Sequence, residues 1–250
     1  AAKLQLESAI RATPPSLRAL AEFGDLLRAG GEAEEALRPY LAALQAHPTH
    51  PRSVLGAAES RLALNRGLED SLRELAAMSK DEQSKPPVAE RLRVELVNAR
   101  LIFGLGRVDD ATRELAASGN RFPGRAEVPA TIAELEMSRG AYDRGEAAAE
   151  RAARLAPDDP AMRELLARAR LGRGRLRELL RETEENPTRG LRLVRAQAYA
   201  ELGEWERARG QLEATRRDGR MPAEAVAWLA LCEVSAGRLP QAAGLVQALE

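Results

Sequence analysis

Two histidines, His47 and His50, lie three residues apart around Pro48, and such a spacing is superficially that of a metal-binding pair. A closed zinc site needs about four ligands, and a catalytic site needs three with water in the open position. The sequence contains no third histidine, and its one cysteine, Cys232, lies far along the chain. We therefore interpret the histidine pair as an exposed turn, and Cys232 as a small buried residue rather than a reactive thiol.

Two glycine-rich segments, Gly104-Leu105-Gly106 and Gly172-Arg173-Gly174, are the nearest approach to a phosphate-binding loop. The first lacks a third glycine at the required spacing, neither follows an expected strand, and no Gly-Lys-Ser/Thr element occurs. Carboxylates are abundant, but sequence alone does not pair them into a catalytic acid and base. We therefore expect no enzymatic activity and no cofactor.

Arginines gather in one stretch of the chain: Arg168, Arg170, Arg173, Arg175, Arg177 and Arg181, with a smaller group at Arg216, Arg217 and Arg220. Such clusters can bind phosphate, an acidic partner or RNA. Glutamates surround the first group, namely Glu164, Glu178, Glu182, Glu184 and Glu185. Pairing of residues i and i+4 on a solvated helix face is therefore the favoured interpretation, and anion binding is the alternative.

The composition limits the classes of partner. Formal net charge is zero and aromatic residues make up 3% of the chain, so neither bulk electrostatics nor base stacking favours nucleic acid or an anionic membrane. No segment approaches the roughly 18 apolar residues of a membrane span. With 44% hydrophobic and 30% charged residues, rich in Ala, Leu, Arg and Glu, the chain is expected to be helical and ordered.

A pattern of small and large residues recurs along the chain at a period of about 34 residues. In residues 17–50, Gly24 and Ala36 are small enough for two helices to approach closely, Leu27 and Tyr40 fill the adjoining space, and Pro48 ends the second helix. The expected units are residues 1–16 (partial), 17–50, 51–87, 88–125, 126–159, 160–188, 189–222 and 223–250. Both ends suggest a fragment cut from a longer array.

Three departures from the period are visible. One residue is inserted near Gly67, and the polar segment 79–87 with its two prolines is expected to form a long loop where the array could bend. Pro187 comes about four residues early, which predicts a second helix shorter by one turn in the unit beginning at Pro160.

These residues resemble the tetratricopeptide repeat, which has a small residue late in the first helix, alanine early in the second and a closing proline. A pentatricopeptide array is the nearest competitor, and the alanines and prolines favour the tetratricopeptide repeat. The resemblance implies an all-α, right-handed superhelical solenoid of antiparallel helix pairs, with residues 1–250 forming one array. It also implies that the first helices line a concave groove that holds a peptide or a partner helix.

Mapping the family's groove positions onto this sequence predicts a partner-binding surface. Its residues are Leu55, Glu59, Leu62, Leu96, Arg100, Phe103, Ala130, Glu134, Met137, Arg168, Leu193 and Gln197. The apolar members would suit an amphipathic helix, although Leu62, Phe103 and Met137 could instead pack against the paired helix. Members that bind a chaperone's C-terminal carboxylate use Lys and Asn, which are absent from the equivalent positions Ala21, Asp25, Leu55, Glu59, Leu96 and Arg100.

The leading function is a non-catalytic scaffold for a protein partner. Arginine outnumbers lysine 35 to three, as in high-GC bacterial genomes, so we expect a bacterial pilus, secretion, polysaccharide-export or polarity assembly. The alternatives are an RNA-binding helical-repeat protein and the interaction arm of a larger enzyme. We expect a cytoplasmic location, or a periplasmic one if a signal sequence was removed, and self-association through uncapped ends is a further expectation.

Overall fold

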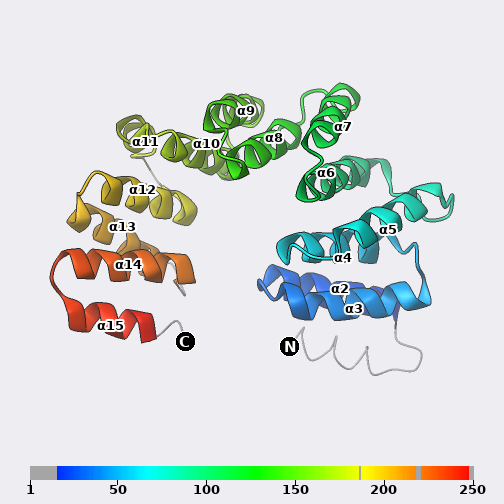
Figure 1. Cartoon of the computed structure of the whole chain (residues 1–250), viewed down its shortest axis with the longest axis horizontal. Coiled ribbons are helices and arrows are strands. Elements are labelled where there is room, and N and C mark those ends of the chain that lie inside the picture. The colour runs from blue at the N-terminus through cyan, green and yellow to red at the C-terminus, as the bar shows by residue number, and fades with distance from the viewer. Residues whose placement is uncertain (1–15, 186, 218–220, 248–250) are drawn as a thin grey trace. The chain divides into compact units, whose positions relative to one another are not determined.

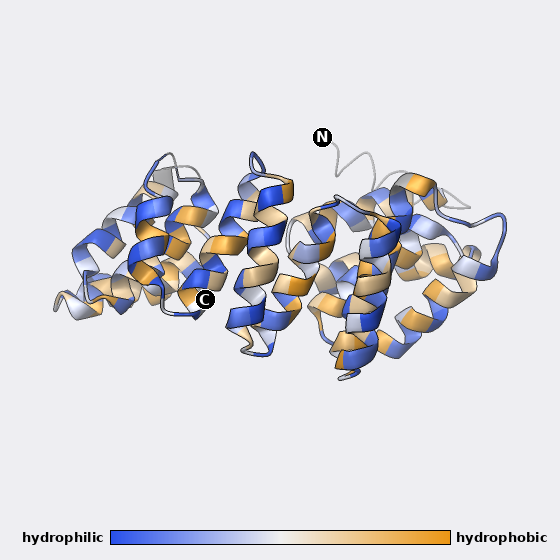
Figure 2. Cartoon of the chain, turned by 90° about the horizontal axis from the view of Figure 1, so that it is seen from above, coloured by the Kyte–Doolittle hydropathy of each residue, from blue (hydrophilic) through white to orange (hydrophobic). Residues whose placement is uncertain are grey.

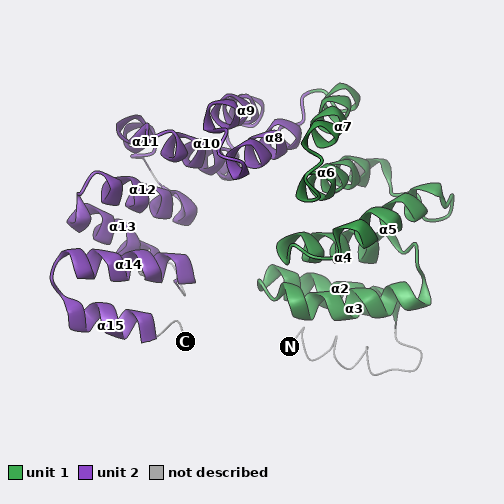
Figure 3. Cartoon of the chain, viewed as in Figure 1, with its two compact units in different colours: residues 1–123 green, residues 124–250 purple. Residues whose placement is uncertain are grey.

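The computed structural model describes residues 16–185, 187–217 and 221–247, and all secondary-structure elements in these ranges are α-helices. Its contacts divide the chain into two compact units, residues 1–123 (unit 1) and 124–250 (unit 2), which are described separately (Figures 1 and 3). The all-α prediction is therefore confirmed. The partial repeat expected before residue 17, apart from Ser16, and Arg220 lie outside the described residues.

The described part of unit 1 contains three helix pairs. They are α2 (Leu17–Ala29) with α3 (Ala33–Ala46), α4 (Pro51–Ala63) with α5 (Leu68–Lys80), and α6 (Val88–Gly104) with α7 (Val108–Arg121). Each helix packs against the next, and the first helices of successive pairs also pack against one another, α2 on α4 and α4 on α6. The second helices make no such contact with each other in the described part of unit 1. The first helices therefore form one continuous layer.

Unit 2 repeats this arrangement, with four pairs among its described residues. They are α8 (Glu127–Ser138) with α9 (Tyr142–Leu155), α10 (Pro160–Gly172) with α11 (Leu176–Glu182), α12 (Arg189–Glu201) with α13 (Trp205–Arg217), and α14 (Ala223–Ser235) with α15 (Leu239–Gln247). The first helices again contact one another in sequence, from α8 to α14. Hydrophobic and hydrophilic residues are interspersed along the helices (Figure 2), as expected where each buries one face.

A tyrosine held between two glycines determines the packing of the first repeats. Tyr40 on α3 is fully buried. A Cβ atom added at Gly24 on α2 would lie 2.6 Å from its ring, and one added at Gly56 on α4 would lie 2.2 Å away. No real side chain tolerates such distances, so α2, α3 and α4 can approach this closely only because both positions lack a Cβ atom.

A left-handed glycine follows the first helix in most pairs. Gly106, Gly140 and Gly174 have φ angles of +78°, +77° and +72° and follow one another at the repeat period. The amide after each glycine donates to a carbonyl five residues earlier, which closes the helix end. Gly104 and Gly172 are the last residues of α6 and α10. Both glycine-rich segments are thus helix-ending turns rather than phosphate loops.

The helix α11 is the clearest departure from regular repeats. It has 7 residues, whereas α3, α5, α7 and α9 have 13 or 14, so it is shorter by almost two turns rather than the one turn predicted. The next helix, α12, therefore starts early in the repeat, at Arg189. Thr188 is its N-cap residue, since its side chain accepts a hydrogen bond from the amide of Leu191. The Arg195 side chain then donates to the carbonyl of Leu180 at the end of α11.

The long loop expected after α5 is present over residues 81–87. Asp81 accepts hydrogen bonds from Thr49 at 2.6 Å, from Ser84 at 2.8 Å and from the amide of Gln83 at 3.0 Å. These bonds hold the pKa of Asp81 below its ordinary value. The loop is therefore attached to the turn between α3 and α4.

The close packing around Tyr40 predicts that an added methyl group destabilises the chain at Gly56 but not at an unpacked helical glycine elsewhere. Gly56→Ala should lower the free energy of unfolding by about 1–3 kcal/mol, because the new methyl group overpacks against the ring. The matched control is Gly210→Ala on α13, where no atom lies within 4 Å of the added Cβ. This change should raise stability by about 0.5–1 kcal/mol. Urea denaturation of both variants measures the difference, and equal stabilities would contradict the packing described.

Candidate interaction surface

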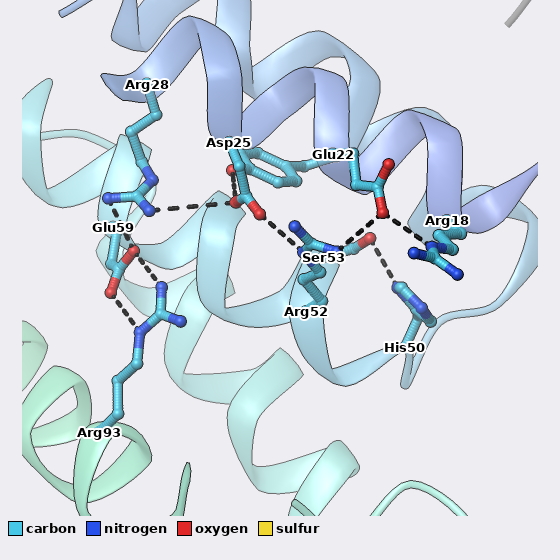
Figure 4. Close-up of polar contacts among 10 residues, drawn as sticks. Arg18, Glu22, Asp25, Arg28, His50, Arg52, Ser53, Glu59 and Arg93 are labelled. Atoms are coloured by element: carbon cyan, nitrogen blue, oxygen red, sulfur yellow. Dashed lines mark hydrogen bonds and ion pairs between the residues drawn. The ribbon is translucent and has the colours of Figure 1, made fainter. Parts of the chain in front are cut away.

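A row of alternating charges crosses the first helices of unit 1, and we call it the charge ladder (Figure 4). It consists of Glu22, Asp25 and Arg28 on α2, Arg52 and Glu59 on α4, and Arg93 on α6. Arg52 lies 2.6 Å from Asp25, and Glu59 lies 3.1 Å from Arg28 and 2.7 Å from Arg93. Each first helix is therefore tied to the next by at least one ion pair between repeats.

The repeat period places these residues together. Glu59 and Arg93 are 34 residues apart, as are Asp25 and Glu59, and Arg52 follows Asp25 by 27 residues. Within α2, Glu22, Asp25 and Arg28 are spaced at i and i+3, so they lie along one helix face. The mapping of groove positions included only Glu59 from this row. A search for opposite charges at these spacings would have found the others.

The buried Tyr40 fixes one carboxylate of the charge ladder, that of Asp25, from the core. Its hydroxyl donates a hydrogen bond to Asp25 Oδ1, while Arg52 binds the other carboxylate oxygen. Burial, together with the neighbouring Asp25, raises the pKa of Tyr40, so the phenol stays protonated and remains a donor. The carboxylate of Asp25 is thus fixed by one bond from the core and one from the next repeat.

The arginines of the ladder extend further into solvent than the carboxylates. The side chains of Arg52 and Arg93 are 45% and 44% exposed, against 27% for Asp25 and 21% for Glu59. Arg93 uses two of its five N–H donors in a bidentate pair with Glu59. The remaining donors can bind carboxylate or carbonyl oxygens of a partner, which is recognition chemistry rather than catalysis.

The apolar residues of the mapped groove lie mostly in the core. Leu55 is fully buried, Leu96 is 6% exposed and Ala130 is 7% exposed. Leu62, Met137 and Leu193 are partly buried and pack against the hydrophobic clusters of their units, and Phe103 is also partly buried. For Leu62 and Met137, the alternative expectation, that they pack within the repeats instead of facing the groove, therefore holds. These side chains do not form an open apolar track, because neighbouring helices already cover them.

The polar residues of the mapped groove remain accessible on first helices. Arg168 is 56% exposed and pairs with Glu164 on its own helix. Gln197 on α12 donates to Glu224 on α14 at 2.8 Å, across the same 27 residues that separate Asp25 from Arg52. Arg100 is partly buried and Glu134 is exposed. Their part in binding stays a prediction.

Three arginines of the cluster around residue 175 surround one buried carboxylate. Glu146 on α9 is 2% exposed and accepts hydrogen bonds from Arg170 at 3.2 Å, Arg173 at 2.6 Å and Arg175 at 2.7 Å. Burial opposes ionisation, but the three guanidinium groups outweigh it and hold the pKa of Glu146 below its ordinary value. These three arginines therefore neutralise a buried charge between helices, whereas Arg168 of the same cluster forms the expected i to i+4 pair, with Glu164.

The two histidines and the cysteine considered as possible ligands or nucleophiles occupy a turn, a helix cap and a buried cluster. His47 is exposed, while the half-buried His50 is the N-cap residue of α4 and lies 2.8 Å from Ser53 Oγ. Cys232 is 1% exposed in a hydrophobic cluster, and burial raises the pKa of its thiol. Among the described residues, no group of three His, Cys, Asp or Glu side chains could hold a metal ion. None of the helices in this part of the chain is long and apolar enough to cross a membrane.

Comparison with known proteins agrees with the arrangement of helices. Residues 131–178 and 193–250 match a family model described as tetratricopeptide repeat. A tetratricopeptide repeat protein from Parabacteroides merdae ATCC 43184 is similar in structure with a TM-score of 0.68 and 20% identity, over 92% of this chain and 90% of that one. A thermophilic TPR protein from Thermus thermophilus gives 0.60 and 22% identity, over 74% of this chain and 100% of that one.

A third similar structure is the APC/C hetero-tetramer Cut9-Hcn1, with a TM-score of 0.62 and 15% identity. The match covers 95% of this chain and 47% of that chain. No curated protein matches the sequence. At these identities the structural likenesses establish the fold alone.

The ion pairs between repeats should be measurable by a double-mutant cycle. Glu59→Gln and Arg93→Gln should show a coupling energy of about 0.2–1 kcal/mol in urea denaturation, and the coupling should weaken at high salt. Glu59→Gln combined with Arg113→Gln on α7 is the control, because these residues make no ion pair with each other and their effects should add. Additive effects in the first cycle at low salt would contradict the ladder.

Removal of the buried carboxylate should be costly. Glu146→Gln should destabilise the chain at neutral pH by up to about 3 kcal/mol, because three guanidinium groups lose their shared counter-charge. Since the folded-state pKa of Glu146 lies below the ordinary value of 4.5, its contribution is present above about pH 4.5 and is lost as the pH falls through the folded-state pKa. Denaturation at several pH values tests this, with the exposed Glu114→Gln as control. Similar stability of both variants at neutral pH would refute it.

Proposed function

We propose that this chain, whose residues 131–178 and 193–250 match a tetratricopeptide repeat model, is a non-catalytic scaffold that binds a segment of a partner protein on the first helices of unit 1. The observation that carries the proposal is the charge ladder. Its arginines project from successive first helices and are held in place by carboxylates of the neighbouring repeats. A binding surface whose side chains are already ordered loses less conformational entropy when a partner binds.

The exposed chemistry of this surface specifies the partner's character. Leu55 and Leu96 are buried, so an amphipathic helix would find few apolar contacts here. Arg28, Arg52 and Arg93 instead offer guanidinium donors at intervals set by the repeats. The partner we propose is therefore an extended segment that carries carboxylate side chains and exposed backbone carbonyls.

A similar structure supports a role in assembly, since Cut9-Hcn1 is named as a hetero-tetramer. The excess of arginine over lysine supports a bacterial origin, and we propose a multiprotein assembly of the pilus, secretion, polysaccharide-export or polarity type, in the cytoplasm or, if a signal sequence was removed, in the periplasm. The interaction arm of a larger enzyme would use the same surface. RNA binding has less support, because Arg168, Arg170, Arg173 and Arg175 are already paired with glutamates.

A pair of double variants tests this surface. Arg52→Gln with Arg93→Gln removes two ladder arginines, and Arg73→Gln with Arg113→Gln removes two arginines from the second helices of the same unit. The control arginines are 74% and 77% exposed, so they are more accessible than those of the ladder. Affinity capture from a lysate of the source organism, with nuclease treatment, should recover a protein with the native chain and the control. The ladder variant should recover it at least about tenfold less well.

Circular dichroism must show equal helicity in all three proteins for the comparison to hold. A partner lost equally from both variants would indicate a general effect of charge. A partner retained by both would place the binding surface elsewhere, and capture of RNA alone, abolished by nuclease, would favour the RNA-binding alternative.

A further inference from the structure

A pocket of about 230 Å³ lies among residues of α11, α12 and α13 in unit 2. Figure 1 shows that these three helices follow one another in the chain. Four arginines line the pocket: Arg177 and Arg181 on α11, Arg195 on α12 and Arg207 on α13. Arg177 and Arg181 belong to the arginine cluster found in the sequence, but neither of them pairs with Glu146. The pocket adjoins the point where α11 ends after only 7 residues.

Arg195 is the unusual member of this group. Only 5% of the residue is exposed, yet its hydrogen-bond partners in the described structure are all neutral. One terminal nitrogen donates to the carbonyl of Leu180 at 2.8 Å and to Thr183 Oγ1 at 3.0 Å, and the other to the hydroxyl of Tyr199 at 3.3 Å. Its Nε atom is buried without a partner. The carbonyl end of α11 offers a partial negative charge, but no carboxylate among the described residues forms an ion pair with this buried cation.

The ring of Tyr199 holds two of the guanidinium groups near each other. The guanidinium carbons of Arg195 and Arg207 lie 5.7 Å and 5.8 Å from the ring centroid, within the range of cation–π attraction. Arg177 and Arg181 are exposed, are spaced at i and i+4 on α11, and form no ion pair within the described part of the chain. Four positive groups of like charge therefore approach one pocket.

The charges of the pocket leave an excess that a ligand could balance. Besides the four arginines, two carboxylates line it, Glu184 and Glu204, and Glu204 already pairs with Arg207 at 2.8 Å. Two positive charges remain uncompensated. The volume of about 230 Å³ is smaller than the roughly 300–1,000 Å³ of pockets that enclose larger organic ligands.

We infer that this pocket binds a phosphate-type oxyanion, either free phosphate or the phosphoryl group of a phosphorylated side chain. Guanidinium groups match the oxygens of a phosphate in geometry, and a dianion would balance the two excess charges. Arg195 would supply the buried charge, and Arg177 and Arg181 would bind from the exposed side. This site lies in unit 2 and does not depend on the charge ladder of unit 1.

Calorimetric titration of the whole chain with inorganic phosphate, phosphoserine and serine tests the inference. Phosphate or phosphoserine should bind, and serine should not. Arg177→Gln with Arg181→Gln should weaken binding at least about tenfold. The matched control is Arg91→Gln with Arg151→Gln, which removes two exposed arginines that lie on α6 and α9 outside the pocket, and it should bind as the native chain does. Tighter binding of phosphoserine than of phosphate would identify a phosphorylated side chain as the ligand, and equal binding would identify free phosphate.

The pH dependence provides a second test. The phosphoryl group of phosphoserine takes up its second proton near pH 6, so the affinity of phosphoserine should rise about tenfold from about pH 5 to about pH 7.5, while the arginines stay charged throughout. Sulfate, which remains a dianion over this range, should bind without that rise. The inference would be overturned if the native chain bound neither phosphate nor phosphoserine, or if the Arg177→Gln, Arg181→Gln variant bound the anion as tightly as the control does.

Discussion

Close approach of helices at positions without large side chains is the constraint on which the structure depends. It is most evident at Tyr40, whose ring occupies the space that a Cβ atom would need at Gly24 and at Gly56. A solenoid buries each repeat only against its neighbours, so loss of one such contact is not compensated elsewhere. The same tyrosine donates its hydroxyl to Asp25 of the charge ladder. Packing in the core therefore also fixes the position of charges on the surface.

Arginine has three distinct roles in this chain, and the partner of each guanidinium group distinguishes them. Around Glu146 the arginines neutralise a buried carboxylate and join helices, so they contribute to the fold. In the charge ladder they are half exposed and aligned by carboxylates, which suits recognition. Around Tyr199 they lack sufficient counter-charge, which suits an anionic ligand. The net charge of the chain is zero, but its arginines are therefore balanced to different extents in different places.

The repeat period was sufficient to predict the helix pairs, the turns after the first helices and that α11 is short, though not by how much, because each depends on residues close in sequence. It did not predict that Leu55 and Leu96 are buried, because the face that a first helix buries depends on how the preceding and following repeats pack against it. Nor could it assign partners within the arginine cluster. Glu146 lies 24 residues before Arg170, and only the fold brings them together.

Binding on the first helices of unit 1 can be tested most directly by site-specific photo-cross-linking in the source cells. A photoreactive residue would replace Glu90 on α6, three residues before Arg93, or Asp109 on the paired helix α7; both positions are exposed. The proposed scaffold predicts that one protein cross-links strongly from position 90 and weakly or not at all from position 109. Equal cross-linking from both positions, or cross-linking from position 109 alone, would contradict it.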